Sequence, residues 1–508
     1  MPTDMDATFL ALPMRALGDA ALQRAQELSV QHADFRLERI RSQHISLRDG
    51  RLEGTHDGED VGFGVRVVHE GTWGFAAAVD LTTDEAVRAV EQAVEIARTA
   101  HDMSPQRIDL ADEPVYPNRT WTSAYRIDPF TVTEADKIQV MADYSRRVLD
   151  HPRVDHVTAH LGQVLEGKYY ADTSGTVTTQ QRVRLHPVVE ALAVDTAGGG
   201  FETMRTLAAP AGRGWEYVTG SDGVVHWDAV LEELPELLTE KLAAPSVEPG
   251  EYDLVIDPTN LWLTIHESIG HATELDRALG YEANYAGTSF ATPDKLGNLN
   301  YGSPLMHVTA DRIAPHGLAT IGFDDEGVEA QRWDIVRDGI LVGYQLDRQM
   351  ARMMADTLDT SRSNGCAYAD SPGHVAVQRM ANVSLQPADG GPSTAELIEQ
   401  LDRGIYIVGD KSWSIDMQRY NFQFTGQRFH RIENGQLAGQ LKDVAYQATT
   451  TDFWRSMAAV GGPQTYVLSG AFNCGKGQPG QVAPVSHGCP AALFRQVRIL
   501  NTAAEGGR

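Results

Sequence analysis

The sequence predicts an α+β protein in which an N-terminal α/β domain is followed by a sheet-rich C-terminal domain. Three observations support this fold class: helical and strand-like segments alternate in the first half, a short hairpin pattern recurs, and a proline-rich linker separates the halves. The chain has 508 residues, which suits about two to four domains of roughly 100–200 residues each.

Apolar residues recur at helical spacing in the first half of the chain. In residues 84–102, Val87, Val90 and Val94 step by three or four positions and form one apolar face. The same reasoning predicts helices over residues 15–32, 133–149 and 226–243, the last despite Pro235. Alternating segments predict strands over residues 35–47, 61–68 and 153–195, the last with a turn at 172–175.

A short pattern with Asp-Gly or Asn-Gly between apolar positions occurs at residues 47–54, 336–343 and 432–439. This dipeptide is a strong signal for a two-residue hairpin, because both central residues take positive φ. Whether the three copies are a repeat or ordinary hairpins, they predict a substantial antiparallel sheet in the second half.

Two prolines and a glycine cluster in residues 243–250, which marks the best candidate linker. We therefore expect an N-terminal α/β domain over residues 1–245 and a mainly antiparallel β domain over residues 246–508.

The chain is acidic, with 43 basic and 69 acidic side chains and a net charge of −26. Such a surface repels phosphate backbones and anionic lipids, so we expect neither nucleic-acid nor membrane binding. The first residues lack the basic region of a signal peptide, and no stretch approaches about 18 consecutive apolar residues. The three cysteines, Cys366, Cys474 and Cys489, are too few for a disulfide framework. We expect a cytoplasmic protein.

Residues 259–279 are predicted to form a helix with one buried stripe, and this helix contains His266-Glu267-Ser268-Ile269-Gly270-His271. In zinc proteases with H-E-x-x-H the two histidines are four positions apart, on one helical face. Here they are five apart, which in a regular helix turns their side chains about 140° from each other. A π-helical turn would bring them together, so we predict a widened or kinked turn at residues 267–271.

Metal chemistry follows from the residue types around this turn. Glu267 directly follows His266, where it would activate a zinc-bound water as general base. The glycine-rich segment Cys474-Gly475-Lys476-Gly477-Gln478 supplies a thiolate whose pKa Lys476 and backbone amides should lower. Two histidines and one cysteine suit zinc, and three protein ligands leave a position for water. We therefore predict one Zn²⁺ per chain, bound by His266, His271 and Cys474, and no other cofactor.

Taken together, several motifs resemble the TldD/PmbA family of metallopeptidases, specifically its catalytic TldD subunit. They are the histidine motif 266–271, the acidic segment 323–327, residues 338–344, residues 379–382 and the cysteine segment 474–478. The resemblance implies that His266, His271 and Cys474 bind zinc and that Glu267 is the general base. It also implies hydrolysis of unfolded or modified peptides, and a heterodimer with a TldE/PmbA-like subunit or a homodimer.

The sequence leaves some alternatives open. A dipeptidyl peptidase III-like enzyme would use a glutamate as third ligand, and a non-catalytic partner or scaffold would hold zinc structurally. Cys489, with His487 nearby, is a rival third ligand, whereas Cys366 is expected to be a buried thiol. Glu274 is expected on a solvated helix face, with a ligating or ligand-orienting role as the alternative.

Two further groups have open roles. The acidic segment Asp324-Asp325-Glu326-Gly327 is expected either to orient a ligand histidine or to form a surface turn. Trp413, Tyr446 and Trp454 line a peptide cleft or belong to the core. Residues 280–285 and 486–489 differ from the family's better-known member, which leaves the substrate preference open. The sequence also does not determine the cleavage mode or the oligomeric state.

Overall fold

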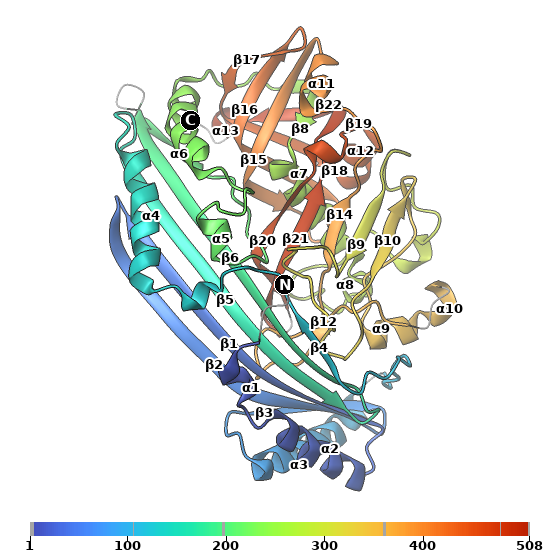
Figure 1. The fold of residues 1–508 in the computed structure, drawn as a ribbon. Helices are drawn as coiled ribbons and strands as arrows, with labels where there is room; N and C mark the ends of the chain where they lie inside the picture. Colours follow the sequence, from blue (N-terminus) through green and yellow to red (C-terminus); the bar gives the residue numbers. More distant parts are fainter. Residues whose placement is uncertain (1–4, 105, 196–198, 359–361, 478, 506–508) are drawn as a thin grey trace.

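A computed structural model describes residues 5–104, 106–195, 199–358, 362–477 and 479–505. Within these ranges two seven-stranded sheets dominate, one in each half of the chain (Figure 1). The first sheet ends at Arg205 and the second begins at Gly250. The α+β class with a sheet-rich C-terminal region is therefore confirmed, while the domain boundary at residue 245 stays a prediction.

The N-terminal sheet has the strand order β3-β2-β1-β5-β6-β4, and β7 also pairs with β6. Its pairings are antiparallel except that β4 runs parallel to β6. Its strands are β1 (His32–Arg48), β2 (Arg51–His69), β3 (Thr72–Ala78), β4 (Arg119–Thr122), β5 (His156–Asp172), β6 (Val177–Asp195) and β7 (Gly200–Arg205). The helices of this half are α1 (Ala7–Leu10), α2 (Met14–Glu27), α3 (Thr83–Ala100), α4 (Glu134–Leu149), α5 (Trp215–Val218) and α6 (Trp227–Ala243).

One face of this long sheet is apolar and is covered by helices at both ends. Alternate residues of a strand point to the same face, so Phe35 and Leu37 share a face with Ile45 and Leu47. Phe35 and Leu37 pack with α2 and α3, while Ile45 and Leu47 pack with α4 and α6 (Figure 1). The four predicted helices are present, and α6 contains Pro235 as expected.

The opposite face of the sheet carries charges and meets the second half of the chain. We define the inner charged cluster as Arg36, Glu38, Glu166, Lys168, Arg182, Arg184 and Asp325. Lys168 Nζ lies 2.7 Å from Asp325 Oδ2, and Arg182 Nε lies 2.9 Å from Glu166 Oε1. Their side chains are at most 9% exposed. The Lys168–Asp325 pair fastens the N-terminal sheet to the loop that contains Asp325, while the Arg182–Glu166 pair joins β6 to β5.

This arrangement corrects the interpretation of the acidic segment 324–327. Asp324, Asp325 and Glu326 are 1%, 4% and 4% exposed, so the segment is not a surface turn. Asp325 pairs with Lys168, Glu326 pairs with Arg66, and Asp324 accepts backbone hydrogen bonds. The segment therefore joins the two halves and orients no ligand histidine.

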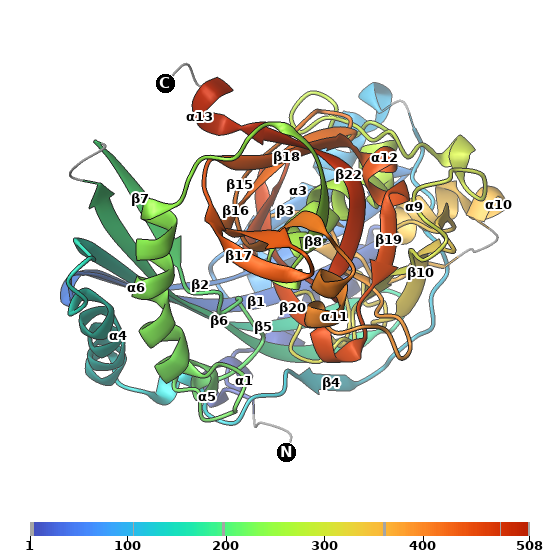
Figure 2. The same ribbon diagram turned by 90° about the horizontal axis from the view of Figure 1, so that it is seen from above.

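The second large sheet closes on itself, because β15-β8-β22-β18-β16 ends with a pairing between β16 and β15 (Figure 2). Only the β8–β15 pair in this sheet is parallel. Its strands are β8 (Gly250–Ile256), β15 (Arg403–Ile415), β16 (Asn421–Glu433), β17 (Gln436–Leu441), β18 (Val444–Thr449), β19 (Met457–Val460) and β22 (Ala492–Asn501). The second half is therefore mainly antiparallel, as expected.

Smaller sheets and short helices surround this ring. The strands are β9 (Val308–Asp311), β10 (Arg332–Arg337), β11 (Ile340–Leu341), β12 (Ala367–Tyr368), β13 (Val377–Gln378), β14 (Asn382–Leu385), β20 (Val467–Lys476) and β21 (Gln481–Cys489). The helices are α7 (Pro258–Ile265), α8 (Leu275–Ala278), α9 (Arg348–Met353), α10 (Ala355–Leu358), α11 (Thr394–Glu399), α12 (Thr450–Arg455) and α13 (Thr502–Glu505). None of the helices in the described ranges has both the length and the apolar character that a bilayer crossing requires.

All three predicted hairpins are present. They connect β1 to β2, β10 to β11 and β16 to β17 through two-residue turns. The central residues have positive φ, as the dipeptides predict: 51° and 70° at Asp49-Gly50, 52° and 76° at Asp338-Gly339, and 49° and 75° at Asn434-Gly435.

Candidate metal centre

The motif helix is widened where the sequence predicts it. Asp257 caps α7 by accepting a hydrogen bond from Thr259 N, and Pro258 takes the first helical position. A π-helical turn, η3 (His266–Gly270), follows α7 directly. A 3₁₀ turn, η4 (His271–Thr273), comes next, and the chain leaves the helix at Glu274 with φ −68° and ψ 114°. The prediction of one helix to residue 279 with a single buried stripe is wrong in two respects. The helix breaks at Glu274, and all residues of η3 and η4 are buried.

Side chains satisfy the carbonyl groups of the widened turn. Tyr301 OH donates to Ser268 O at 2.5 Å, and Gln345 Nε2 donates to Gly270 O at 2.8 Å. Thr273 Oγ1 donates to Ile269 O at 2.8 Å. Because buried carbonyl groups need partners, these contacts stabilise the π-helical geometry.

Gly270 has ordinary helical φ and packs closely against Met380. A Cβ at this position would lie 2.5 Å from Met380 Sδ and 3.4 Å from His487 Cε1. A side chain at this position would therefore require Met380 to move, whereas its contact with His487 would be an ordinary one.

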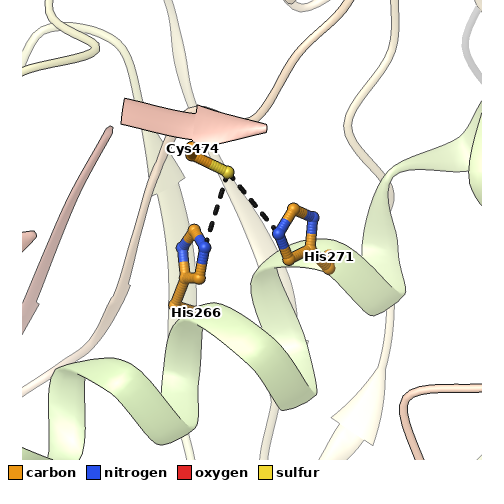
Figure 3. A group of neighbouring side chains, drawn as sticks. All are labelled: His266, His271 and Cys474. Carbon is orange, nitrogen blue, oxygen red and sulfur yellow. Dashed lines mark hydrogen bonds between the residues drawn. The ribbon is translucent and has the colours of Figure 1, made fainter. Parts of the chain in front are cut away.

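The two histidines and Cys474 converge on one point (Figure 3). Cys474 Sγ lies 3.5 Å from His266 Nε2 and 3.5 Å from His271 Nε2, and the three donor atoms lie within 4.8 Å of one another. A tetrahedral zinc site with Zn–N of about 2.0–2.1 Å and Zn–S of about 2.3 Å sets nitrogen and sulfur roughly 3.6 Å apart. The donor types and their spacing therefore fit a zinc ion.

Cys474 reaches the helix from a two-stranded ribbon near the end of the chain. β20 pairs with β21, and the register shifts between Ala471 and Cys474, which indicates a bulge just before the thiol. Arg379 Nη2 donates to the Cys474 carbonyl at 2.7 Å and fixes the backbone there. Burial alone would raise the pKa of the Cys474 thiol, but His271 and Arg379 lower it overall.

Lys476 does not act on the thiol in the way that the sequence suggests. Its Nζ lies 3.3 Å from Glu274 Oε1, 2.9 Å from Asp276 Oδ2 and 3.2 Å from Glu282 Oε1. Lys476 therefore pairs with a group of buried carboxylates and anchors the end of β20. Gln478 lies outside the described residues.

Each of the two motif histidines has a hydrogen-bond partner at its Nδ1. His271 Nδ1 lies 2.8 Å from Glu274 Oε2, and His266 Nδ1 lies 2.8 Å from His487 Nε2. Glu274 is 0% exposed, so the expectation of a solvated helix face is wrong; the helix break at this residue turns it inward. Burial lowers the pKa of both His266 and His271, which favours their neutral forms.

Glu267 lies beside the donor atoms and is held by Arg419. Arg419 Nη1 donates to Glu267 Oε2 at 2.7 Å, and Arg419 Nη2 donates to Ala286 O at 3.2 Å. Arg419 is in the β15–β16 connection with φ 63°, and Thr450 Oγ1 donates to its carbonyl. No sequence pattern predicts this arginine, because its contact with the motif depends on how the β15–β16 hairpin packs.

A cavity of about 430 Å³ opens over these side chains. His266, Glu267, His271 and Cys474 line it together with two continuous runs, residues 205–210 and 469–475. Trp413 also lines the cavity and is 55% exposed. Tyr446 and Trp454 are 0% exposed and belong to the core.

The other two cysteines lie elsewhere. Cys366 is buried, as expected, and burial raises the pKa of its thiol to about 11. Cys489 Sγ lies 3.5 Å from Pro258 O, away from the converging donor atoms. Within the described residues, the group of three donors that fits a metal contains Cys474 and neither Cys489 nor a glutamate.

Comparisons with known proteins agree with this geometry. A model of the PmbA/TldA metallopeptidase C-terminal domain matches residues 249–501, and a model of PmbA/TldA metallopeptidase domain 1 matches residues 33–97. The chain belongs to the PmbA/TldD family. The resemblance that the motifs suggest is therefore confirmed, and it leaves little support for a dipeptidyl peptidase III-like enzyme.

Relatives within the PmbA/TldD family cover nearly the whole chain. A metalloprotease of Methanocaldococcus jannaschii is 26% identical and aligns with 90% of this chain and 94% of its own. A zinc metalloprotease TldD homolog of Saccharolobus solfataricus is 24% identical over 94% of this chain and 98% of its own. The crystal structure of TldE from Thermococcus kodakarensis shares the fold, with a TM-score of 0.68, 14% identity and coverage of 95% of this chain and 99% of that one.

Proposed function

We propose that the protein is a zinc-dependent metallopeptidase that hydrolyses peptide bonds in unfolded or modified peptides. One zinc ion per chain would be held by His266, His271 and Cys474, with Glu267 as general base. The observation that carries the proposal is the convergence of both Nε2 atoms and Sγ beside a carboxylate, at the wall of a cavity. The names of the two relatives above agree with this activity.

The residues of the site have separable tasks. When bound, zinc supplies Lewis acidity that polarises a carbonyl group and acidifies water. Glu267 would accept a proton from the attacking water on a carboxylate oxygen and deliver it to the leaving amine. Arg419 keeps the Glu267 carboxylate oriented toward the cavity through the 2.7 Å contact. Buried donor atoms and a half-enclosed cavity restrict access of bulk water.

We infer that the cavity binds its substrate as an extended peptide. Among the described strands β20 pairs with β21 alone, so no described strand pairs with its other edge. Residues 469–475 of this strand line the cavity together with residues 205–210. A substrate added as a strand at this edge would be held through its backbone, largely independent of sequence.

We further propose a cytoplasmic location and a partner subunit, either a TldE/PmbA-like chain or a second copy of this chain. The fold shared with TldE is the support for such a pair. The alternative of a non-catalytic scaffold is less well supported, because a structural zinc site usually has four protein ligands whereas three converge here.

Metal analysis combined with a peptide-hydrolysis assay tests the proposal. The full-length protein is loaded with zinc and incubated with unfolded peptides, alone and with a co-expressed TldE-like subunit. We expect one zinc per chain and measurable cleavage, with Glu267→Gln retaining zinc and losing about 10²- to 10⁴-fold in rate.

Glu95→Gln, on an exposed position of α3, is the matched control and should keep full activity. Full activity in Glu267→Gln would remove the general-base assignment. A zinc-loaded protein that cleaves no peptide in either assembly would refute the metallopeptidase function.

A further inference from the structure

We propose that His487 is a positioning residue that fixes the ring orientation and tautomer of His266, so that His266 presents Nε2 to a metal ion. The inference rests on the metal binding of the proposed function. His487 comes from β21, 221 residues after His266, and neither the histidine motif nor the cysteine segment includes it.

The carbonyl oxygen of Val383 sets the direction of the two hydrogen bonds that link it through His487 to His266. His487 Nδ1 lies 2.7 Å from Val383 O, and a carbonyl oxygen only accepts, so Nδ1 carries the proton. In the neutral ring Nε2 is then an acceptor, and it lies 2.8 Å from His266 Nδ1. His266 Nδ1 must donate, which leaves the lone pair of His266 Nε2 free to point at the metal position.

The His487 ring is held rigidly enough to do this. It is 0% exposed and stacks on Trp262, with 6.2 Å between ring centroids and 12° between planes. On another side it approaches Gly270, where a Cβ would lie 3.4 Å from His487 Cε1. The neighbouring Gly488 N donates to Ser384 Oγ at 2.9 Å and ties β21 to β14.

The two ligand histidines are therefore supported differently. His271 donates to a carboxylate, Glu274, whose charge Lys476 and Arg277 balance. His266 donates to a neutral imidazole, which orients the ring without adding negative charge beside the metal position. A second carboxylate here would make His266 more basic and would lower the positive charge that a bound zinc ion offers to substrate.

Replacing the acceptor tests this role. In His487→Leu the Nδ1–H of His266 would be buried without an acceptor, and in His487→Asn the side chain is too short to reach it. His487→Gln keeps an acceptor for His266 and a donor for Val383 O. We expect the zinc dissociation constant to rise about 10- to 100-fold in the Leu and Asn variants and to stay near the wild-type value in the Gln variant.

The measurement is chelator competition on the full-length protein, with zinc as the probe and the Co²⁺ absorption spectrum as a second readout. The Co²⁺ bands should shift in the Leu and Asn variants and be restored in the Gln variant. His430→Gln, at a half-buried histidine on β16, is the control and should change neither readout. If His487→Leu does not fold, the comparison between Asn and Gln decides.

The outcomes separate this inference from the proposed function. Wild-type affinity and an unchanged Co²⁺ spectrum in the Asn variant would overturn the role of His487, as would a folded Gln variant that binds zinc as weakly as Asn. A wild-type protein that binds no zinc would overturn both. If it binds zinc and cleaves no peptide, only the peptidase proposal fails.

Discussion

The metal centre and the inner charged cluster are both buried and polar, yet they are built differently. In the inner charged cluster every charged side chain has an oppositely charged partner, such as Lys168 with Asp325 and Arg182 with Glu166. At the candidate metal centre three donor atoms, two Nε2 and one Sγ, face one another. Hydrogen bonds at the Nδ1 atoms of the two histidines fix the orientation of their rings.

This difference distinguishes a structural polar group from a binding site. Paired charges compensate the cost of leaving water and hold two parts of the chain together. Donor atoms that converge without an opposite charge between them are arranged to bind a cation. The predictions below test this comparison, from the largest expected effect to the smallest.

Removing the sulfur should empty the metal centre. We expect Cys474→Ser to lose zinc on dialysis and to lose hydrolysis completely, because a serine hydroxyl is not ionised at neutral pH and two histidines remain as ligands. Metal analysis after dialysis provides the measurement. Cys489→Ser is the matched control, since that thiol faces Pro258 O, and it should keep its zinc. Zinc loss in the control alone would reverse the assignment of the third ligand.

Removing one charge from the inner charged cluster should act on stability. Glu166 accepts hydrogen bonds from Arg182 and Arg184, and Glu166→Gln leaves buried positive charge uncompensated. We expect a loss of about 3–5 kcal/mol in the free energy of unfolding, with the zinc dissociation constant of the folded protein unchanged. Urea unfolding compares this variant with Glu53→Gln on the exposed part of β2, which should match the wild type. Equal stability of both variants would contradict a structural role.

Arg419→Met should separate orientation of Glu267 from metal binding. Without the guanidinium the carboxylate of Glu267 is free to rotate, and we expect kcat to fall about 10²-fold because the base is misplaced. The zinc content should not change, since Arg419 contacts none of the three donors. Single-turnover hydrolysis with metal analysis checks both points, and a drop in zinc content would show that Arg419 supports the metal centre itself.

Acid should lower the free energy of unfolding by protonating Asp34, a buried carboxylate of the N-terminal sheet. Burial alone would raise the pKa of Asp34, but Arg66 and His32 lower it from 3.8 to about 2. This carboxylate stabilises the fold above its unfolded pKa, and the contribution disappears as pH falls from about 4 to 2. The full shift corresponds to about 2 kcal/mol. The unfolding free energy of Asp34→Asn should depend less on pH across this window than that of the wild type, and parallel curves would argue against the effect.

Much of the fold and of the metal centre could be predicted because the signals are local. The hairpin dipeptides require positive φ, the helix periods are regular, and the five-residue spacing of His266 and His271 has few solutions other than a widened turn. The glycine-rich loop also predicted Cys474 as the third donor. The predicted effect of Lys476 on the thiol was wrong, because its partners Asp276 and Glu282 could not be inferred from this loop.

The remaining features depend on contacts between segments far apart in the chain. Glu274 continues the helical period in the sequence, but the backbone breaks there and turns it inward. His487 and Arg419 reach the motif only because β21 and the β15–β16 connection pack against it. Asp325 meets Lys168 across 157 residues, which no local pattern reveals.

The late position of the sulfur donor has a consequence for biosynthesis. Cys474 lies 203 residues after His271, and the strand that completes the closed ring, β22, comes later still. A chain still being translated, or one truncated before this segment, has the histidines but neither the thiol nor the finished ring. Under the proposed function, hydrolytic capacity therefore arises only after both Cys474 and β22 have been synthesised.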